Sequence, residues 1–181
     1  MLIGRREVLL TASSAALISS IPGAAPAQRR LPDGGMEQAR AMAAITQVMN
    51  EWAYEADTNY GRAMATADVL TKDCRCRLEG RWITGLDKIA SFYKTRFAGI
   101  VAGEPAPIIR QLLTNFRISF TSDTEAKVGL SLLLFTKVGK APVNDYCDPV
   151  EVADVRAECR CAADGHWRIS FLDSDRIFRR D

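Results

Sequence analysis

The spacing of apolar residues changes along this chain, and that change constrains the fold more than any other feature. Up to residue 97, apolar side chains recur mostly at three- and four-residue steps, as helices with one buried face require. From Ile108 onward they alternate with polar side chains, as they do in strands. Helices followed by antiparallel strands that short turns connect favour an α+β domain.

The same pattern predicts the individual elements. Helices are predicted at residues 36–56, 60–70 and 84–97. Alternation around Glu79-Gly80 predicts a small hairpin at residues 74–83. Strands are predicted at residues 116–120, 126–138, 151–161 and 167–171. Ser122-Asp123 and Asp164-Gly165 are predicted to turn the chain, the latter as a two-residue hairpin turn.

Residues 1–27 have the features of an export signal. Arg5-Arg6 supply the positive charge, residues 8–21 an apolar stretch, and Ala25-Pro26-Ala27 a cleavage site of small residues. The apolar stretch is too short to anchor the chain stably, so no membrane span is expected after cleavage. We therefore predict a twin-arginine-like signal peptide, a linker at residues 28–36 and one domain at residues 37–181, in a periplasmic or secreted protein. An uncleaved membrane tether is the alternative.

The charge balance and the histidine count exclude several classes of function. Lys and Arg total 24 and Asp and Glu total 22, which gives a net charge of +2. That balance is unsuited to a nucleic-acid binder that relies on charge, so no nucleic-acid partner is expected. His166 is the one histidine, which excludes a metal site built from several histidines. No metal and no cofactor are expected.

The five cysteines do not form a zinc pattern. Cys74 and Cys76, like Cys159 and Cys161, are separated by one residue, whereas zinc ribbons use Cys-x-x-Cys. Disulfides are permitted outside the cytoplasm, but five cysteines leave one unpaired and the pairing open. We interpret Cys159 and Cys161 as small buried core residues.

Five short phrases, in this order, carry a resemblance to a known family. They are residues 69–74 (VLTKDC), 84–89 (TGLDKI), 110–115 (RQLLTN), 151–156 (EVADVR) and 164–169 (DGHWRI). With the order of elements, they make residues 38–179 resemble the SnoaL-like branch of the nuclear-transport-factor-2-like superfamily. The resemblance implies a curved antiparallel sheet wrapped around N-terminal helices, forming a cone with a deep, mostly apolar pocket. Its members include dehydratases, isomerases, polyketide cyclases, non-catalytic binding proteins and small subunits of dioxygenases, so the fold does not decide the function.

Tyr54 and Asp57 are the predicted catalytic residues. Catalytic members that this chain resembles often carry a Tyr and an Asp on the first helix, and three-residue spacing places these two on one side of it. A carboxylate in an apolar cone has a raised pKa and acts as a general base, while the tyrosine hydroxyl polarises a carbonyl. The alternative is that Asp57 caps the helix and Tyr54 packs in the core. Trp52 and Tyr60 are assigned to the same cluster as substrate-binding residues.

Residue 111 departs from the family pattern. Dehydratase-like members usually carry a His after the Arg of the strand phrase, and this chain has Gln111, which forms hydrogen bonds but cannot shuttle a proton. Residues 127–135, the next strand, contain no acidic partner, so a His-Asp dyad is absent from the expected places. Strand alternation would place Leu113 and Asn115 on the pocket side with Gln111, where the two amides would orient a ligand. Asn115 alternatively satisfies backbone groups at a bend of the sheet.

The remaining apolar residues of this strand predict a partner subunit. Alternation would place four of them on the outer face of the sheet: Leu112, Phe116, Ile118 and Phe120. An apolar outer face on a small domain is typically covered by a second copy, so a homodimer is expected.

Two functions are consistent with these features. The first is an exported enzyme that performs elimination, isomerisation or cyclisation on a hydrophobic ring compound by general acid–base chemistry. Asp57 would be the base, Tyr54 the hydrogen-bond donor, and Gln111 with Asn115 would orient the substrate. The second is a non-catalytic binding or accessory domain that has lost the His-Asp dyad. An accessory subunit of a larger oxygenase is a weaker third option.

Overall fold

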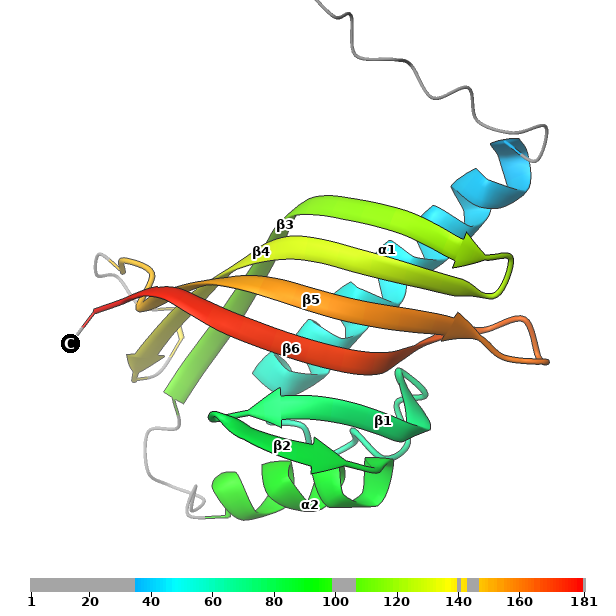
Figure 1. Ribbon diagram of the computed structural model, residues 1–181. Coiled ribbons are helices and arrows are strands. Elements are labelled where there is room, and N and C mark those ends of the chain that lie inside the picture. The colour runs from blue at the N-terminus through cyan, green and yellow to red at the C-terminus, as the bar shows by residue number, and fades with distance from the viewer. Residues whose placement is uncertain (1–34, 99–106, 140, 143–146, 181) are drawn as a thin grey trace, which may run out of the picture. The chain divides into compact units, whose positions relative to one another are not determined.

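The described part of the chain forms two helices and six strands. The computed structural model describes residues 35–98, 107–139, 141–142 and 147–180, and these elements belong to one compact unit, residues 34–181. In chain order they are α1 (Gly35–Thr58), β1 (Leu70–Leu78), β2 (Arg81–Thr84), α2 (Leu86–Arg96), β3 (Pro107–Ser122), β4 (Glu125–Val138), β5 (Glu151–Cys161) and β6 (Trp167–Arg179) (Figure 1). α1 begins inside the stretch that the sequence predicts to be linker.

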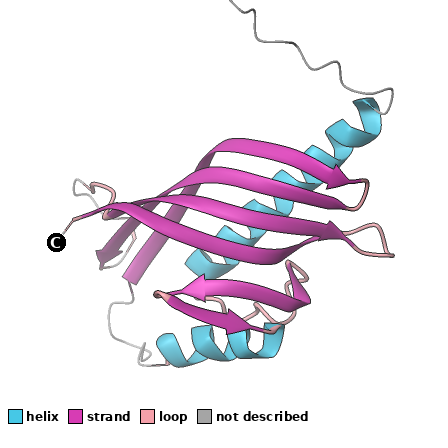
Figure 2. Ribbon diagram, viewed as in Figure 1, coloured by secondary structure: helices cyan, strands magenta, loops and turns pink. Residues whose placement is uncertain are grey.

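The strands form one curved sheet, and the predicted α+β class is confirmed. The strand order is β2-β1-β6-β5-β4-β3. Strands β3 to β6 form the predicted antiparallel meander, but β1 and β6 run parallel, so the sheet is mixed and not antiparallel throughout. The reason is the path of the chain: it leaves the β1–β2 hairpin through α2 and starts β3 at the far edge, so β6 returns beside β1 (Figure 2).

The core lies between α1 and one face of the sheet. α1 crosses behind strands β3 to β6 in the view of Figure 1. Its buried face includes Ile45, Met49 and Trp52, which recur at three- and four-residue steps, whereas Met42, which has the same spacing, is 39% exposed. Alternate residues of β4 and β5 pack against this face, and they are Ala126, Val128, Leu130, Leu132, Val155, Ala157 and Cys159.

The segment after α1 is not the helix that its periodicity predicts. Turns occupy residues 60–66, and β1 starts at Leu70. Tyr60 and Gly61 have positive φ angles of 54° and 68°, which a right-handed helix does not permit. The buried carboxylate of Glu55 directs this path, since it accepts hydrogen bonds from Asn59 Nδ2 and from the backbone N–H of Ala63, each at 2.6 Å.

A β-bulge divides β3 into two parts. Thr114 pairs with Ser131 and Arg117 pairs with Gly129, so two residues of β3 face one residue of β4. Asn115, the first of the two, has a φ of 56°, a conformation that asparagine tolerates better than most residues. The bulge reverses the alternation, and the prediction of an outward face for the residues after it is therefore wrong. Three of those residues pack against the core, and they are Phe116, Ile118 and Phe120.

Of two predicted hairpin turns, one is confirmed and the other is longer than predicted. The hairpin at Glu79-Gly80 is confirmed, with positive φ at both positions. The turn before β6 is one residue longer than predicted, because the backbone N–H of Ala162 donates to the carbonyl of His166 and Gly165 takes the positive φ.

The five cysteines are free thiols. Cys159 is buried in the core, as predicted, and burial raises its pKa to about 12, whereas Cys161 is half-buried.

Neither described helix combines the length and the apolar character that crossing a bilayer requires.

Candidate active site

The carboxylate of Asp57 is fixed by a single residue of β3. Asp57 lies in the last turn of α1 and is 6% exposed. Its Oδ2 accepts the backbone N–H of Gln111 at 2.6 Å, and its Oδ1 accepts Nε2 of the same residue at 2.9 Å. Both oxygens therefore have defined positions. Residue 111 therefore has an acidic partner, but this partner is Asp57 on α1 and not a residue of the following strand, where it was expected.

Burial dominates the electrostatics of Asp57. Removal from water raises the pKa of this carboxyl above its ordinary value, although the two hydrogen bonds from Gln111 and the charge of Arg110 act in the opposite direction. A carboxylate with a raised pKa binds a proton more readily than a free aspartate does. Such a group is suited to general base catalysis.

A cavity of about 490 Å³ opens beside this carboxylate, between α1 and β3. Eight residues line it, and they are Gln47, Asn50, Glu51, Ala53, Tyr54, Asp57, Arg110 and Gln111. Every one of them except Ala53 carries a polar group, and their aliphatic and aromatic parts form the rest of the wall. The wall of the cavity is therefore mostly apolar in surface, with polar groups placed along it, and the cavity has room for a ligand of two fused rings.

Three of the predicted site residues meet at this cavity, namely Tyr54, Asp57 and Gln111. Tyr54 is 67% exposed, so its predicted alternative, packing in the core, is wrong. Its hydroxyl and ring are open to a ligand beside the Asp57 carboxylate.

The other four predicted residues lie elsewhere. Trp52 is buried in the core, and Leu113 packs against that core from β3. Tyr60 donates its hydroxyl to the carbonyl of Pro107 at 3.0 Å, and its ring packs on Phe97 with centroids 5.1 Å apart. Asn115 is exposed at the bulge. The prediction for Asn115 assumed unbroken alternation along β3, and the bulge removes that basis.

Sequence reasoning missed several lining residues, and two of them are charged. Gln47, Glu51 and Tyr54 follow one another at four- and three-residue steps, which places them on one stripe of α1. That stripe is visible in the sequence once Tyr54 is taken as a site residue. Arg110 directly precedes Gln111, but simple alternation would send its side chain to the opposite face of the sheet.

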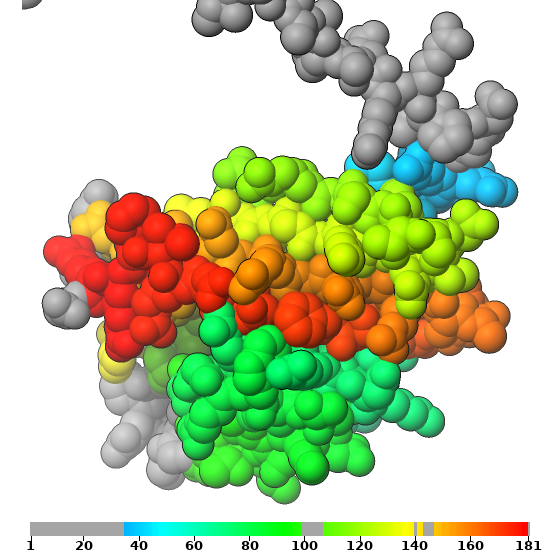
Figure 3. All heavy atoms as spheres, in the orientation of Figure 1, coloured from blue at the N-terminus to red at the C-terminus, as the bar shows by residue number. Residues whose placement is uncertain are grey.

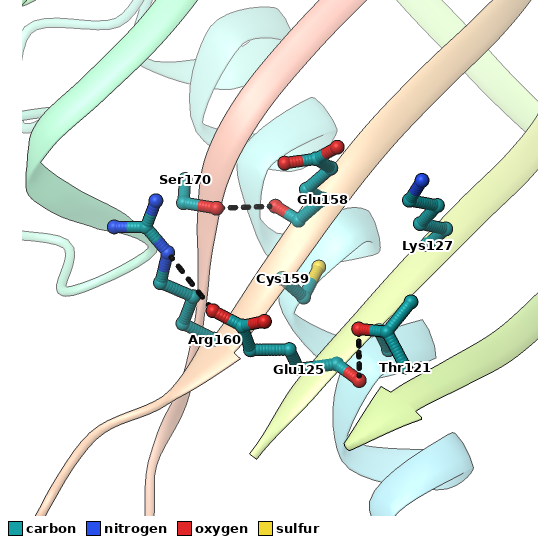
Figure 4. A pocket seen from close by; sticks show the side chains of 8 residues that line it. Thr121, Glu125, Lys127, Glu158, Cys159, Arg160 and Ser170 are labelled. Atoms are coloured by element: carbon teal, nitrogen blue, oxygen red, sulfur yellow. Dashed lines mark hydrogen bonds and ion pairs between the residues drawn. The ribbon is translucent and has the colours of Figure 1, made fainter.

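A second, smaller hollow of about 220 Å³ lies over β4, β5 and β6. Figure 4 shows Ser170 and Thr121 directed at backbone carbonyl groups and Arg160 directed at Glu125. The Ser170 hydroxyl donates to the carbonyl of Glu158 at 3.1 Å, and Nε of Arg160 lies 3.9 Å from the Glu125 carboxylate. Within the residues that the structure describes, no group of three or more His, Cys, Asp or Glu side chains is placed to hold a metal ion.

The sequence model of one family matches most of the chain. Its description is "SnoaL-like domain", and the match covers residues 37–173. A search of curated proteins found no match.

Solved structures share the fold at low sequence identity. A candidate scytalone dehydratase from Novosphingobium aromaticivorans is 21% identical, covers 81% of this chain and 91% of its own, and has a TM-score of 0.61. A hexachlorocyclohexane dehydrochlorinase, LinA type 2, is 14% identical, with coverage of 81% and 91% and a TM-score of 0.60. ActVI-ORFA from Streptomyces coelicolor is 14% identical, with coverage of 76% and 98% and a TM-score of 0.62. At these identities the likeness establishes the fold alone.

Proposed function

This chain belongs to the SnoaL-like domain family, and from that premise we propose that it is an enzyme that removes a proton from a carbon atom of a ring compound. Asp57 is the general base, Tyr54 the hydrogen-bond donor and Gln111 the residue that positions the base. The observation that carries the proposal is the buried Asp57 carboxylate, held by two hydrogen bonds at the wall of a ligand-sized cavity.

The proposed reaction begins at a carbon next to a carbonyl group. Asp57 accepts the proton from that carbon, the C–H electron pair forms a carbon–carbon double bond, and the carbonyl π pair moves to the oxygen. The resulting enolate has three outcomes. It expels a leaving group from the next carbon, which is elimination, and the Asp57 proton passes to solvent. If the Asp57 carboxyl first exchanges its proton with solvent, return of a proton to the same carbon is exchange, and return to a different carbon is isomerisation. The hydroxyl of Tyr54 hydrogen-bonds the substrate oxygen throughout.

Gln111 gives the site a simpler proton path than a His-Asp dyad has. An amide neither gains nor loses a proton near neutral pH. Asp57 must therefore both accept and return the proton, while Gln111 keeps both carboxylate oxygens in place. The names of structural relatives, among them a dehydrochlorinase and a candidate dehydratase, support elimination as the first reaction to test.

Non-catalytic binding is the second candidate function. Gln111 favours it, because the family's proton-shuttling residue is missing at that position. Exchange of the protons next to the carbonyl of 2-tetralone in deuterium oxide, followed by NMR, separates the two. Catalysed exchange supports the enzyme. Binding of 2-tetralone without any exchange would support the binding domain.

We also propose that the chain forms a homodimer through the face of the sheet opposite α1. Leu112, Leu133, Val152 and Phe178 are paired in one row across β3, β4, β5 and β6. Figure 3 shows that neither helix covers this face. Leu112 is 53% and Phe178 68% exposed, and such an apolar row is typical of a subunit contact.

Replacing Leu112 by Glu is expected to convert the dimer into monomers, because the contact would then bury two unpaired carboxylates, one from each copy. Light scattering during size-exclusion chromatography measures the mass directly. Ala44→Glu, at an exposed position of α1 on the other side of the sheet, is the control and should remain dimeric. A wild-type monomer at tens of micromolar would contradict the proposal.

Export is proposed on the sequence alone, since residues 1–27 lie outside the described part of the chain. Replacing Arg5 and Arg6 together by Lys is expected to retain the protein in the bacterial cytoplasm, because twin-arginine export depends on the arginine pair. Cell fractionation of the wild type and the double variant checks this. Equal amounts of both in the periplasm would contradict a twin-arginine route.

A further inference from the structure

Arg110 is the one cationic side chain among the residues that line the cavity. It directly precedes Gln111, the residue that holds the Asp57 carboxylate, and it lines the same cavity as both of them. Its charge acts to lower the pKa of Asp57. Its Nη1 donates to the carbonyl of Ile109 at 2.5 Å, and the guanidinium has further N–H groups to offer. Among the described residues, no carboxylate forms an ion pair with it.

The chemistry of the proposed site calls for such a group. An enolate develops a full negative charge on its oxygen, and Gln111 cannot supply a compensating positive charge. Tyr54 offers a neutral hydrogen bond. Arg110 offers a permanent positive charge and several donors in a fixed plane, because a guanidinium keeps its proton throughout the accessible pH range.

The second carboxylate of the cavity does not cancel this charge. Glu51 lies six residues before Asp57 on α1, which separates the two by about 9 Å along the helix axis. Its Oε1 accepts a hydrogen bond from Gln47 at 2.8 Å, toward the start of the helix. The cavity is therefore polarised, with a cation beside the base and an acceptor at the far end. The ring of Tyr54 lies between these ends on the same stripe of α1.

We propose that Arg110 is the oxyanion-binding residue of this site. The carbonyl oxygen of the substrate meets the guanidinium of Arg110, which acts together with the hydroxyl of Tyr54. This inference rests on the proposed function, because it takes Asp57 as the base.

The first test is exchange of 2-tetralone protons by substituted proteins. Arg110→Gln is expected to lower the rate about 100-fold, the loss typical of removing one oxyanion donor. Arg110→Lys keeps the charge and should recover part of that loss. Arg117→Gln, an exposed arginine on the same strand beyond the bulge, is the matched control and should exchange at the wild-type rate. An unchanged rate in Arg110→Gln would overturn the proposal.

The second test uses 2-naphthol, whose anion resembles the enolate of 2-tetralone, and reads the bound pKa from its fluorescence. Arg110→Gln is expected to raise the pKa of bound 2-naphthol by about one unit, and Asp57→Asn to lower it, because each removes a neighbouring charge of opposite sign. Titrations of the wild type and the Arg110→Gln variant that coincide would overturn the role of Arg110. A wild-type protein that does not bind 2-naphthol at millimolar concentration would also overturn this role, because an oxyanion-binding site must hold an anion of this kind.

Different results would contradict the proposed function and the proposed role of Arg110. If Asp57→Asn retains full exchange, the proposed function is wrong, whatever Arg110 does to 2-naphthol. If Asp57→Asn abolishes exchange while Arg110→Gln leaves both exchange and the naphthol titration unchanged, the proposed function stands and the role of Arg110 is wrong.

Discussion

Replacing Asp57 by Asn is expected to lower the rate of 2-tetralone exchange about 1,000-fold. The amide cannot accept a proton from carbon, and general base catalysis typically contributes a factor of this order. The substitution keeps the size of the side chain and one acceptor for Gln111. Loss of the reaction with retained binding of 2-tetralone, measured by NMR, would identify Asp57 as the base and not as a binding group.

Two controls accompany this prediction. Glu37→Gln removes an exposed carboxylate in the first turn of the same helix, outside the cavity, and should leave the exchange rate at the wild-type value. The wild-type rate should rise with pH through the pKa of Asp57, above the ordinary value of an aspartate, and then level off. The sign follows from the base being active only when deprotonated. A bell-shaped profile with a second limb near neutral pH would contradict a site whose cation is an arginine.

Replacing Gly61 by Ala is expected to destabilise the fold by about 3 kcal/mol. Gly61 has a φ of 68°, in the left-handed region, and an added Cβ would lie 2.4 Å from Cγ of Tyr93. The conformation costs an L residue about 1–2 kcal/mol, and forcing a methyl group against a buried ring adds about the same. Tyr93 is buried on α2 and cannot move away freely. Urea unfolding followed by circular dichroism measures the difference.

Gly80→Ala separates the two causes. Gly80 has a φ of 77° and no atom within 4 Å of the position an added Cβ would occupy. This variant should lose only the conformational part, about 1 kcal/mol. Equal losses in the two variants would show that the contact with Tyr93 contributes nothing.

The sequence predicts the structure well where one spacing of apolar residues continues through a whole helix or strand. The buried face of α1 and the bounds of β5 can both be predicted from the spacing of apolar residues. Nothing interrupts the helical period in α1 or the alternation in β5. Tyr54 and Asp57 were placed together for the same reason: an unbroken helix turns residues three apart to one side.

The sequence does not predict the structure where a single residue changes which side chains face the core. At the bulge, the side chain of Asn115 is exposed to solvent and that of Phe116 packs against the core. A single asparagine within a strand does not predict this change of face. The path of residues 59–63 depends on the buried side chain of Glu55, which spacing alone does not reveal. The Asp57–Gln111 contact joins residues 54 positions apart, so its geometry depends on packing across the whole core.

The parallel pairing of β1 with β6 has a consequence for how the chain is made. β6 lies between β1 and β5, so the last strand of this domain to be synthesised is the one that joins the hairpin to the meander. Leu70 pairs with Ile169, which lies 99 positions further along the chain. Contacts of this range close slowly, because a long loop of chain must be ordered first. The nascent domain therefore carries two open strand edges, those of β1 and β5, until β6 has been made and inserted between them.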